Sequence, residues 1–167
     1  MTSWLFKGML AAAIALPALS GVARAGGTDD FGCSNATLKG EYAFGVTNFT
    51  IPQVVAGIKV FDGNGDVTQR DYIGDSVPAE FAPKGQEQGT YTVNSDCTGS
   101  MVINLNVPAS LLPPGTSTGV INILFVISNG GRHIHEVVSQ LTPPGAMGPE
   151  AVQTSADDWK VAREDER

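Results

Sequence analysis

The feature that most constrains the fold is the alternation of short runs rich in β-branched residues with clusters of Gly, Asn, Asp and Pro. Such runs form strands, and the clusters supply the turns between them. Few segments show the spacing of an amphipathic helix. The pattern predicts an all-β domain with eight strands, at 38–48, 54–61, 66–73, 88–94, 99–106, 119–128, 132–141 and 148–154.

Three turn clusters indicate that neighbouring strands pair as antiparallel hairpins. They lie at 62–66 (Asp-Gly-Asn-Gly-Asp), 94–99 and 128–131 (Ser-Asn-Gly-Gly). Asn-Gly and Asp-Gly tolerate the positive φ that tight hairpin turns require. Successive hairpins predict an antiparallel meander that closes into a roughly eight-stranded barrel, although an open two-sheet sandwich also fits the pattern.

Two of the expected strands are apolar on both faces. The segment 121–127 is almost wholly apolar, and so is 54–61, in which Lys59 is the lone charge. A strand that is apolar on both sides is expected to be covered on both sides. One side would line the interior, and the other would meet a neighbouring layer, a loop or a partner subunit, which leaves a homo-oligomer open.

The first 25 residues have the three parts of a secretory signal peptide. Lys7 supplies the basic start, 9–19 the apolar run, and Ala23 and Ala25 the small residues before a cleavage point. The apolar run is shorter than the roughly 20 residues of a membrane span. We therefore expect cleavage near Ala25 and a secreted or periplasmic protein.

Removal of residues 1–25 would leave a β-barrel domain at 26–154 and a charged C-terminal tail at 155–167. The loss of Lys7 and Arg24 would change the formal net charge from −7 to −9. An acidic chain with few, scattered basic residues is unsuited to binding nucleic acid. No second long apolar segment follows, so we expect no stable membrane span unless the strands form an outer-membrane barrel.

The C-terminal tail differs in composition from the rest of the chain. Ser155 could cap a short helix with Trp159 as its apolar anchor. The last five residues are expected to be a solvated charged end.

Two cysteines, Cys33 and Cys97, remain after the signal peptide. An isolated pair in an oxidising compartment is most simply a disulfide. Two thiols without further Cys or His ligands close by make a poor metal site. The sequence therefore predicts a Cys33–Cys97 disulfide.

His133 and His135 are the candidate catalytic residues. They are two apart on an expected strand, so their side chains share one face. A third metal ligand would have to come from elsewhere, such as Asp71 or Glu80, and two ligands alone are short of a zinc site. We therefore assign no metal or cofactor from the sequence, and two hydrogen-bonded or exposed histidines remain the simpler interpretation.

The 62–66 segment also resembles the start of a calcium loop, because Asp62, Asn64 and Asp66 alternate. Such a loop needs a glutamate at its twelfth position, and Ile73 stands there. A hairpin turn accounts for every residue.

Aromatic residues recur on the expected strands. Most should pack in the core, but an eight-stranded barrel is just wide enough to hold one small ligand. The candidate ligand-binding residues are Tyr42, Phe44, Tyr91 and Phe125.

Segments 33–44 (Cys-Ser-Asn-Ala-Thr-Leu-Lys-Gly-Glu-Tyr-Ala-Phe), 60–67 and 89–99 (Gly-Thr-Tyr-Thr-Val-Asn-Ser-Asp-Cys-Thr-Gly) together resemble a group of small secreted bacterial proteins of undefined function. The resemblance covers 33–140, and 145–151 and the acidic tail depart from it. It implies a barrel akin to the allene oxide cyclase and lipocalin architectures and supports the Cys33–Cys97 bridge. It carries over no catalytic residue.

Three functions follow as hypotheses, with a non-enzymatic function favoured. The first is a binding module for a small hydrophobic molecule inside the barrel. The second is a cyclase or isomerase in which His133 or His135 assists proton transfer. The third is a structural or self-associating surface protein that uses 119–128 as its interface.

Overall fold

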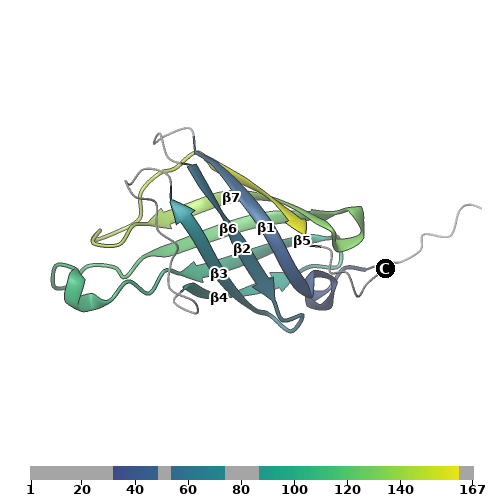
Figure 1. Cartoon of the computed structure of the whole chain (residues 1–167), viewed down its shortest axis with the longest axis horizontal. Helices are drawn as coiled ribbons and strands as arrows, with labels where there is room; N and C mark the ends of the chain where they lie inside the picture. Colours follow the sequence, from purple (N-terminus) through teal and green to yellow (C-terminus); the bar gives the residue numbers. More distant parts are fainter. Residues whose placement is uncertain (1–31, 49–53, 74–86, 162–167) are drawn as a thin grey trace, which may run out of the picture. The chain divides into compact units, whose positions relative to one another are not determined.

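The computed structural model describes residues 32–48, 54–73 and 87–161, which form a closed barrel of eight antiparallel strands (Figure 1). Each strand pairs with the next, and the last pairs with the first from Tyr42↔Lys160 to Asn48↔Thr154. The predicted all-β barrel is therefore confirmed, and the open sandwich is not formed. The strands are β1 (Gly40–Asn48), β2 (Val54–Phe61), β3 (Asp66–Ile73), β4 (Glu87–Val93), β5 (Thr98–Asn104), β6 (Val120–Ser128), β7 (His133–Thr142) and β8 (Thr154–Lys160).

The prediction is wrong for the last strand. β8 occupies Thr154–Lys160 instead of 148–154, within the segment expected to be a charged tail or short helix. Ala156 and Asp158 face the interior, while Asp157 and Trp159 face outward. Two adjacent aspartates disfavour a strand by local propensity. The burial of Asp158 depends on a lysine from β2, which the local sequence does not reveal.

The two ends of the barrel differ in their connections. At one end are the tight turns β2–β3, β4–β5 and β6–β7, together with the short 3-10 helices η1 (Asn35–Leu38) and η3 (Asn129–Gly131). The longer connections that the structure describes, at 105–119 and 143–153, lie at the opposite end. One 3-10 turn, η2 (Ala109–Leu111), lies in the first of these.

A disulfide fixes η1 across the hairpin end. Cys33, just before η1, is bonded to Cys97 in the β4–β5 turn, as predicted. The Cys33 N–H also donates to the Ser95 carbonyl at 3.2 Å. The bridge holds Leu38 inside the barrel, where it is fully buried.

Two tyrosine hydroxyls tie η1 and the turns to the barrel wall. The Tyr42 hydroxyl donates to the carbonyl of Gly131 in η3. The Tyr91 hydroxyl donates to the Asn35 carbonyl at 2.9 Å and accepts from the Gly63 N–H at 3.1 Å. These bonds satisfy buried polar groups at the hairpin end of the barrel. Both tyrosines therefore have structural roles.

The β2–β3 turn confirms the hairpin interpretation of 62–66. Oδ1 of Asp62 accepts the N–H groups of Asn64, Gly65 and Asp66 at 2.7, 3.0 and 3.0 Å. These bonds lower the pKa of the Asp62 carboxyl. The carboxylate thus holds the turn closed.

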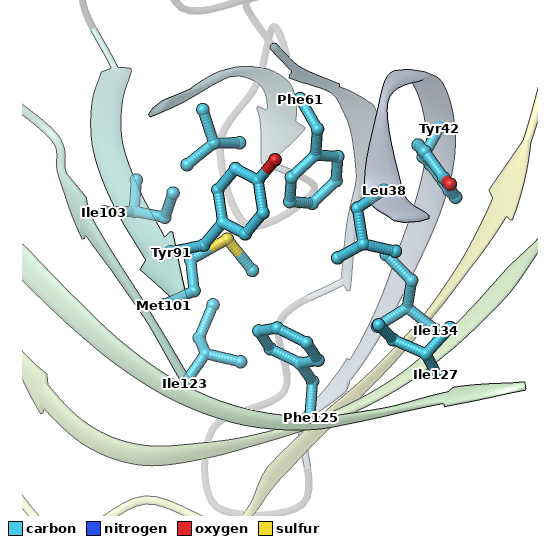
Figure 2. Packing of buried hydrophobic residues seen from close by; sticks show 11 residues of the cluster. Leu38, Tyr42, Phe61, Tyr91, Met101, Ile103, Ile123, Phe125, Ile127 and Ile134 are labelled. Carbon is cyan, nitrogen blue, oxygen red and sulfur yellow. The ribbon is translucent and has the colours of Figure 1, made fainter. Parts of the chain in front are cut away.

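Apolar side chains pack together inside the barrel (Figure 2). Phe61 lies between Tyr42 and Tyr91 in two edge-to-face contacts, with ring centroids 5.3 and 5.0 Å apart. The buried cluster comprises Leu38, Tyr42, Phe61, Val67, Tyr91, Met101, Ile103, Ile123, Phe125, Ile127 and Ile134.

The outer face of β6 is apolar, as the sequence indicates, but is not fully covered within the chain. Leu124 and Val126 are 55% and 49% exposed. Coverage by a partner subunit stays a prediction.

Replacing both cysteines, as Cys33→Ala with Cys97→Ala, is expected to lower the free energy of unfolding by roughly 2–4 kcal/mol, because the bridge closes a long loop in the unfolded chain. Urea denaturation followed by circular dichroism measures the change. Reduction of the native protein should give a similar shift. An unchanged midpoint in both experiments would show that the bridge contributes no stability.

Candidate functional site

Six polar or charged side chains lie inside the barrel beyond the apolar core. All are buried, with at most 6% exposure. On β3 and β4, the inward residues change from apolar to polar with distance from the hairpin end, and on β2 and β7 a buried charged residue follows the inward apolar residue next to that end. We call this group the interior polar cluster; it consists of Lys59, Gln69, Asp71, Glu87, Glu136 and Asp158.

Lys59 of β2 crosses the interior to reach β7 and β8. Its Nζ lies 2.6 Å from Oε2 of Glu136 and 3.1 Å from Oδ2 of Asp158. All three side chains are at most 2% exposed. Such a network is retained only where charge and hydrogen-bond geometry compensate for lost hydration.

The Phe44 ring packs against the same ammonium group. Lys59 Nζ lies 4.5 Å from the ring centroid, a cation–π distance. A glycine on β2 makes room for this ring, because a Cβ at Gly57 would come within 2.7 Å of Phe44 Cε1. Phe44 is thus the candidate ligand-binding aromatic that lies at the charged part of the interior.

The second half of the cluster lies on β3 and β4. Nε2 of Gln69 donates to Oδ2 of Asp71 at 3.2 Å. Glu87 stands directly opposite Gln69 in the strand register.

Two buried carboxylate oxygens in this cluster have no hydrogen-bond partner among the described residues. They are Oε2 of Glu87 and Oε1 of Glu136. A buried acceptor that makes no hydrogen bond is costly and is rare in native proteins. Both oxygens are therefore available to a donor that enters the interior.

Burial raises the pKa of three carboxyl groups in the cluster, those of Asp71, Glu87 and Asp158. It raises the pKa of Asp158 to about 8, which Lys59 opposes and the charge of Glu136 increases. Burial, followed by the charge of Asp71, raises the pKa of Glu87 to about 7. Burial also raises the pKa of Asp71.

Lys59 keeps its charge in this setting. Burial alone would lower its pKa, but the charges and hydrogen bonds of Glu136 and Asp158 outweigh burial and raise it. Within the described part of the chain, the interior thus contains one ammonium group and four carboxyl groups.

The remaining aromatic candidates are interior residues with structural roles. Tyr42, Tyr91 and Phe125 belong to the apolar core, and both tyrosine hydroxyls bond to backbone groups. Because these three side chains are engaged in the core, they have few free groups with which to contact a ligand.

The two histidines lie on the outer face of the barrel. Their neighbours Ile134 and Glu136 point inward and are buried, whereas the His135 side chain is 53% exposed. They are close to Asp157 of β8 instead of the predicted third ligands, because Asp71 faces the interior. Glu80 lies outside the described residues. Neither histidine thus faces the interior, and a catalytic role for His133 or His135 stays a prediction.

The interior polar cluster is not predicted from the sequence, although one residue signals it. Lys59 is the lone charge in an apolar strand. A lysine at such a position is either exposed to solvent or buried beside a charged partner. Its partners lie 77 and 99 residues away in the chain. Only the strand register brings them together.

The fold and its interior define a class: closed eight-stranded antiparallel barrels that contain both an apolar core and buried charged side chains. No protein-family model matches the chain, and no curated protein does. Among solved structures, it is similar to EF1p2_mFAP2b bound to DFHBI, with a TM-score of 0.54 and 13% sequence identity. The match covers 75% of this chain and 94% of that chain, and it shows a shared fold. Among the described residues, no helix is long and apolar enough to cross a membrane.

The protein is expected to lose stability as pH rises from about 5 to about 9. Asp158 has a raised pKa in the folded chain, so the folded state binds more protons than the unfolded state over this window. Its contribution to the slope is at most about 1.4 kcal/mol per pH unit. Thermal melts across this pH range measure the change in stability. Asp158→Asn should make stability less dependent on pH. A native profile that rises with pH would contradict the assignment.

Lys59→Met is expected to lower the free energy of unfolding by roughly 3–5 kcal/mol, because it leaves buried carboxyl groups without their cation. The triple variant Lys59→Met, Glu136→Gln, Asp158→Asn should recover much of this loss. Urea denaturation compares the two, with Lys39→Met at an exposed lysine as the control. Equal effects at Lys59 and Lys39 would show that the buried network is unimportant for stability.

Proposed function

We propose that this protein is a binding module that holds a small molecule inside the barrel, against the interior polar cluster. The ligand has an apolar body and at least one hydrogen-bond donor or positive charge. The observation that carries the proposal is the pair of buried, unpartnered oxygens on Glu87 and Glu136. A donor from a ligand would satisfy them where the described side chains do not.

The charge balance of the interior supports this choice of ligand. Among the described residues, the interior contains four carboxyl groups and one ammonium group, which Glu136 and Asp158 already engage. An anionic ligand would find no free cation among these side chains, and the ionised carboxyl groups would repel it. A neutral donor or a cation would instead gain attraction in a region of low dielectric constant.

The distribution of apolar side chains indicates where in the barrel the ligand would bind. The apolar cluster is made of packed side chains, so a purely hydrophobic ligand bound within it would have to displace them. Phe44 offers an aromatic surface next to the charged groups. The ligand we propose is therefore amphipathic, which refines the small hydrophobic molecule expected from the sequence.

The architecture is compatible with such a role. Eight-stranded barrels are just wide enough to hold one small ligand. The structurally similar EF1p2_mFAP2b is described as bound to DFHBI, a small ligand. This likeness supports the binding of a small molecule in general, and the specific ligand rests on the interior polar cluster alone.

Proton-transfer catalysis of the cyclase or isomerase kind is the second candidate. The pKa values of about 7 for Glu87 and about 8 for Asp158 are those of useful general acids and bases near neutral pH. Because both histidines lie outside, these carboxyl groups would take the role that the sequence gave to His133 or His135.

We also propose that the protein is exported and loses residues 1–25. The signal-like N-terminal segment and the Cys33–Cys97 disulfide support this, because disulfides persist in oxidising compartments. The same proposal includes a relationship between this chain and the small secreted bacterial proteins that its sequence resembles.

A titration with N-phenyl-1-naphthylamine, an apolar fluorescent probe with one N–H donor, tests the binding proposal. We expect saturable binding to the folded protein. The matched anionic probe 8-anilino-1-naphthalenesulfonate should bind at least about tenfold more weakly, because the interior carries excess negative charge.

Two neighbouring tryptophan variants locate the probe. Val55 follows the inward alternation of β2, whereas Val54 is 66% exposed. Val55→Trp should fill the interior and weaken binding about tenfold or more, while Val54→Trp should leave it unchanged. Equal binding by both variants, or no binding by the native protein, would refute the proposed site.

A further inference from the structure

A second cluster lies on the outer face of β7 and β8, separate from the interior polar cluster. His133 and His135 alternate on β7, and Asp157 and Trp159 alternate on β8. The register places His135 opposite Asp157 and His133 opposite Trp159. Residues that are far apart in the sequence thus form one compact group.

One carboxylate oxygen is shared by both imidazoles. Oδ1 of Asp157 lies 3.1 Å from Nε2 of His133 and 2.8 Å from Nδ1 of His135. The three potential ligand atoms all lie within 4.8 Å of one another. They converge on one point at the barrel surface.

These separations are close to those of a metal centre. With bonds of about 2.0–2.2 Å to imidazole nitrogen and carboxylate oxygen, tetrahedral ligand atoms are about 3.3 Å apart. The two His–Asp distances would need to change by only a few tenths of an ångström. The exposed His135 ring has room to make this adjustment, since its side chain is 53% exposed.

The surrounding residues orient the two rings. His133 stacks on Trp159, with ring centroids 3.6 Å apart and planes inclined by 15°. The other ring nitrogen of His135, Nε2, lies 3.4 Å from Ser128 Oγ. Histidines that bind metals commonly engage an outer group through the nitrogen that is not bound to the metal.

We propose that His133, His135 and Asp157 form a surface site for a divalent transition-metal ion such as Zn²⁺ or Cu²⁺. Imidazole and carboxylate ligands suit these ions. Asp157 is 60% exposed, so the ion has direct access and keeps coordination positions open to solvent. The third ligand that the sequence left unassigned comes from β8.

Isothermal titration of the full-length protein with Zn²⁺ alone, without a histidine tag, tests the site. We expect one ion per chain, with affinity lowered at least tenfold in His135→Ala and in Asp157→Asn. Glu150→Gln, which removes an exposed carboxylate elsewhere, should bind as the native protein does. Absence of Zn²⁺ binding, or unchanged binding in both ligand variants, would overturn the proposal.

Electron paramagnetic resonance of the native protein with Cu²⁺ gives a test that needs no variant. The chain has only two histidines, so a spectrum with two imidazole nitrogens can arise only from this pair within one chain. We expect that spectrum at one equivalent of Cu²⁺ in dilute protein. A spectrum with no imidazole nitrogen would overturn the proposal.

Discussion

The structure depends on the neutralisation of a lysine inside a closed barrel. Lys59 projects inward from β2 and is balanced by Glu136 and Asp158, which β7 and β8 supply. Removing each of these charged groups from water costs several kcal/mol. Burial of the lysine therefore depends on the two acidic side chains, and burial of the acidic side chains depends on the lysine. Pairing of β8 with β1 positions Asp158 within reach of Lys59. The ion network is thus possible only once the barrel is closed.

The interior contains two groups of side chains with different properties. The apolar cluster is packed, and the disulfide and the tyrosine hydroxyl bonds tie the hairpin end to it. The interior polar cluster leaves oxygens of Glu87 and Glu136 without a partner among the described residues. Natural proteins break the rules of core packing mainly at functional sites. We therefore propose that the polar cluster serves binding and that the apolar cluster serves stability.

Local sequence signals predict most of this fold. Asp-Gly, Asn-Gly and alternating apolar residues identify every strand except the last to within a few residues, because hairpins depend on contacts between neighbours in the chain. β8 was missed since Asp157 and Asp158 have low strand propensity, and their roles depend on distant partners. The sequence likewise predicts that His133 and His135 share a face. Their third neighbour, Asp157, is fixed by the register of β8.

The most direct test of the binding account is native mass spectrometry of the protein isolated from the cell that produces it. The account predicts a retained organic molecule that has an apolar body and a hydrogen-bond donor, and its loss in Val55→Trp but not in Val54→Trp. A native protein that has only the mass of its own chain, and that also fails to bind N-phenyl-1-naphthylamine, would contradict it.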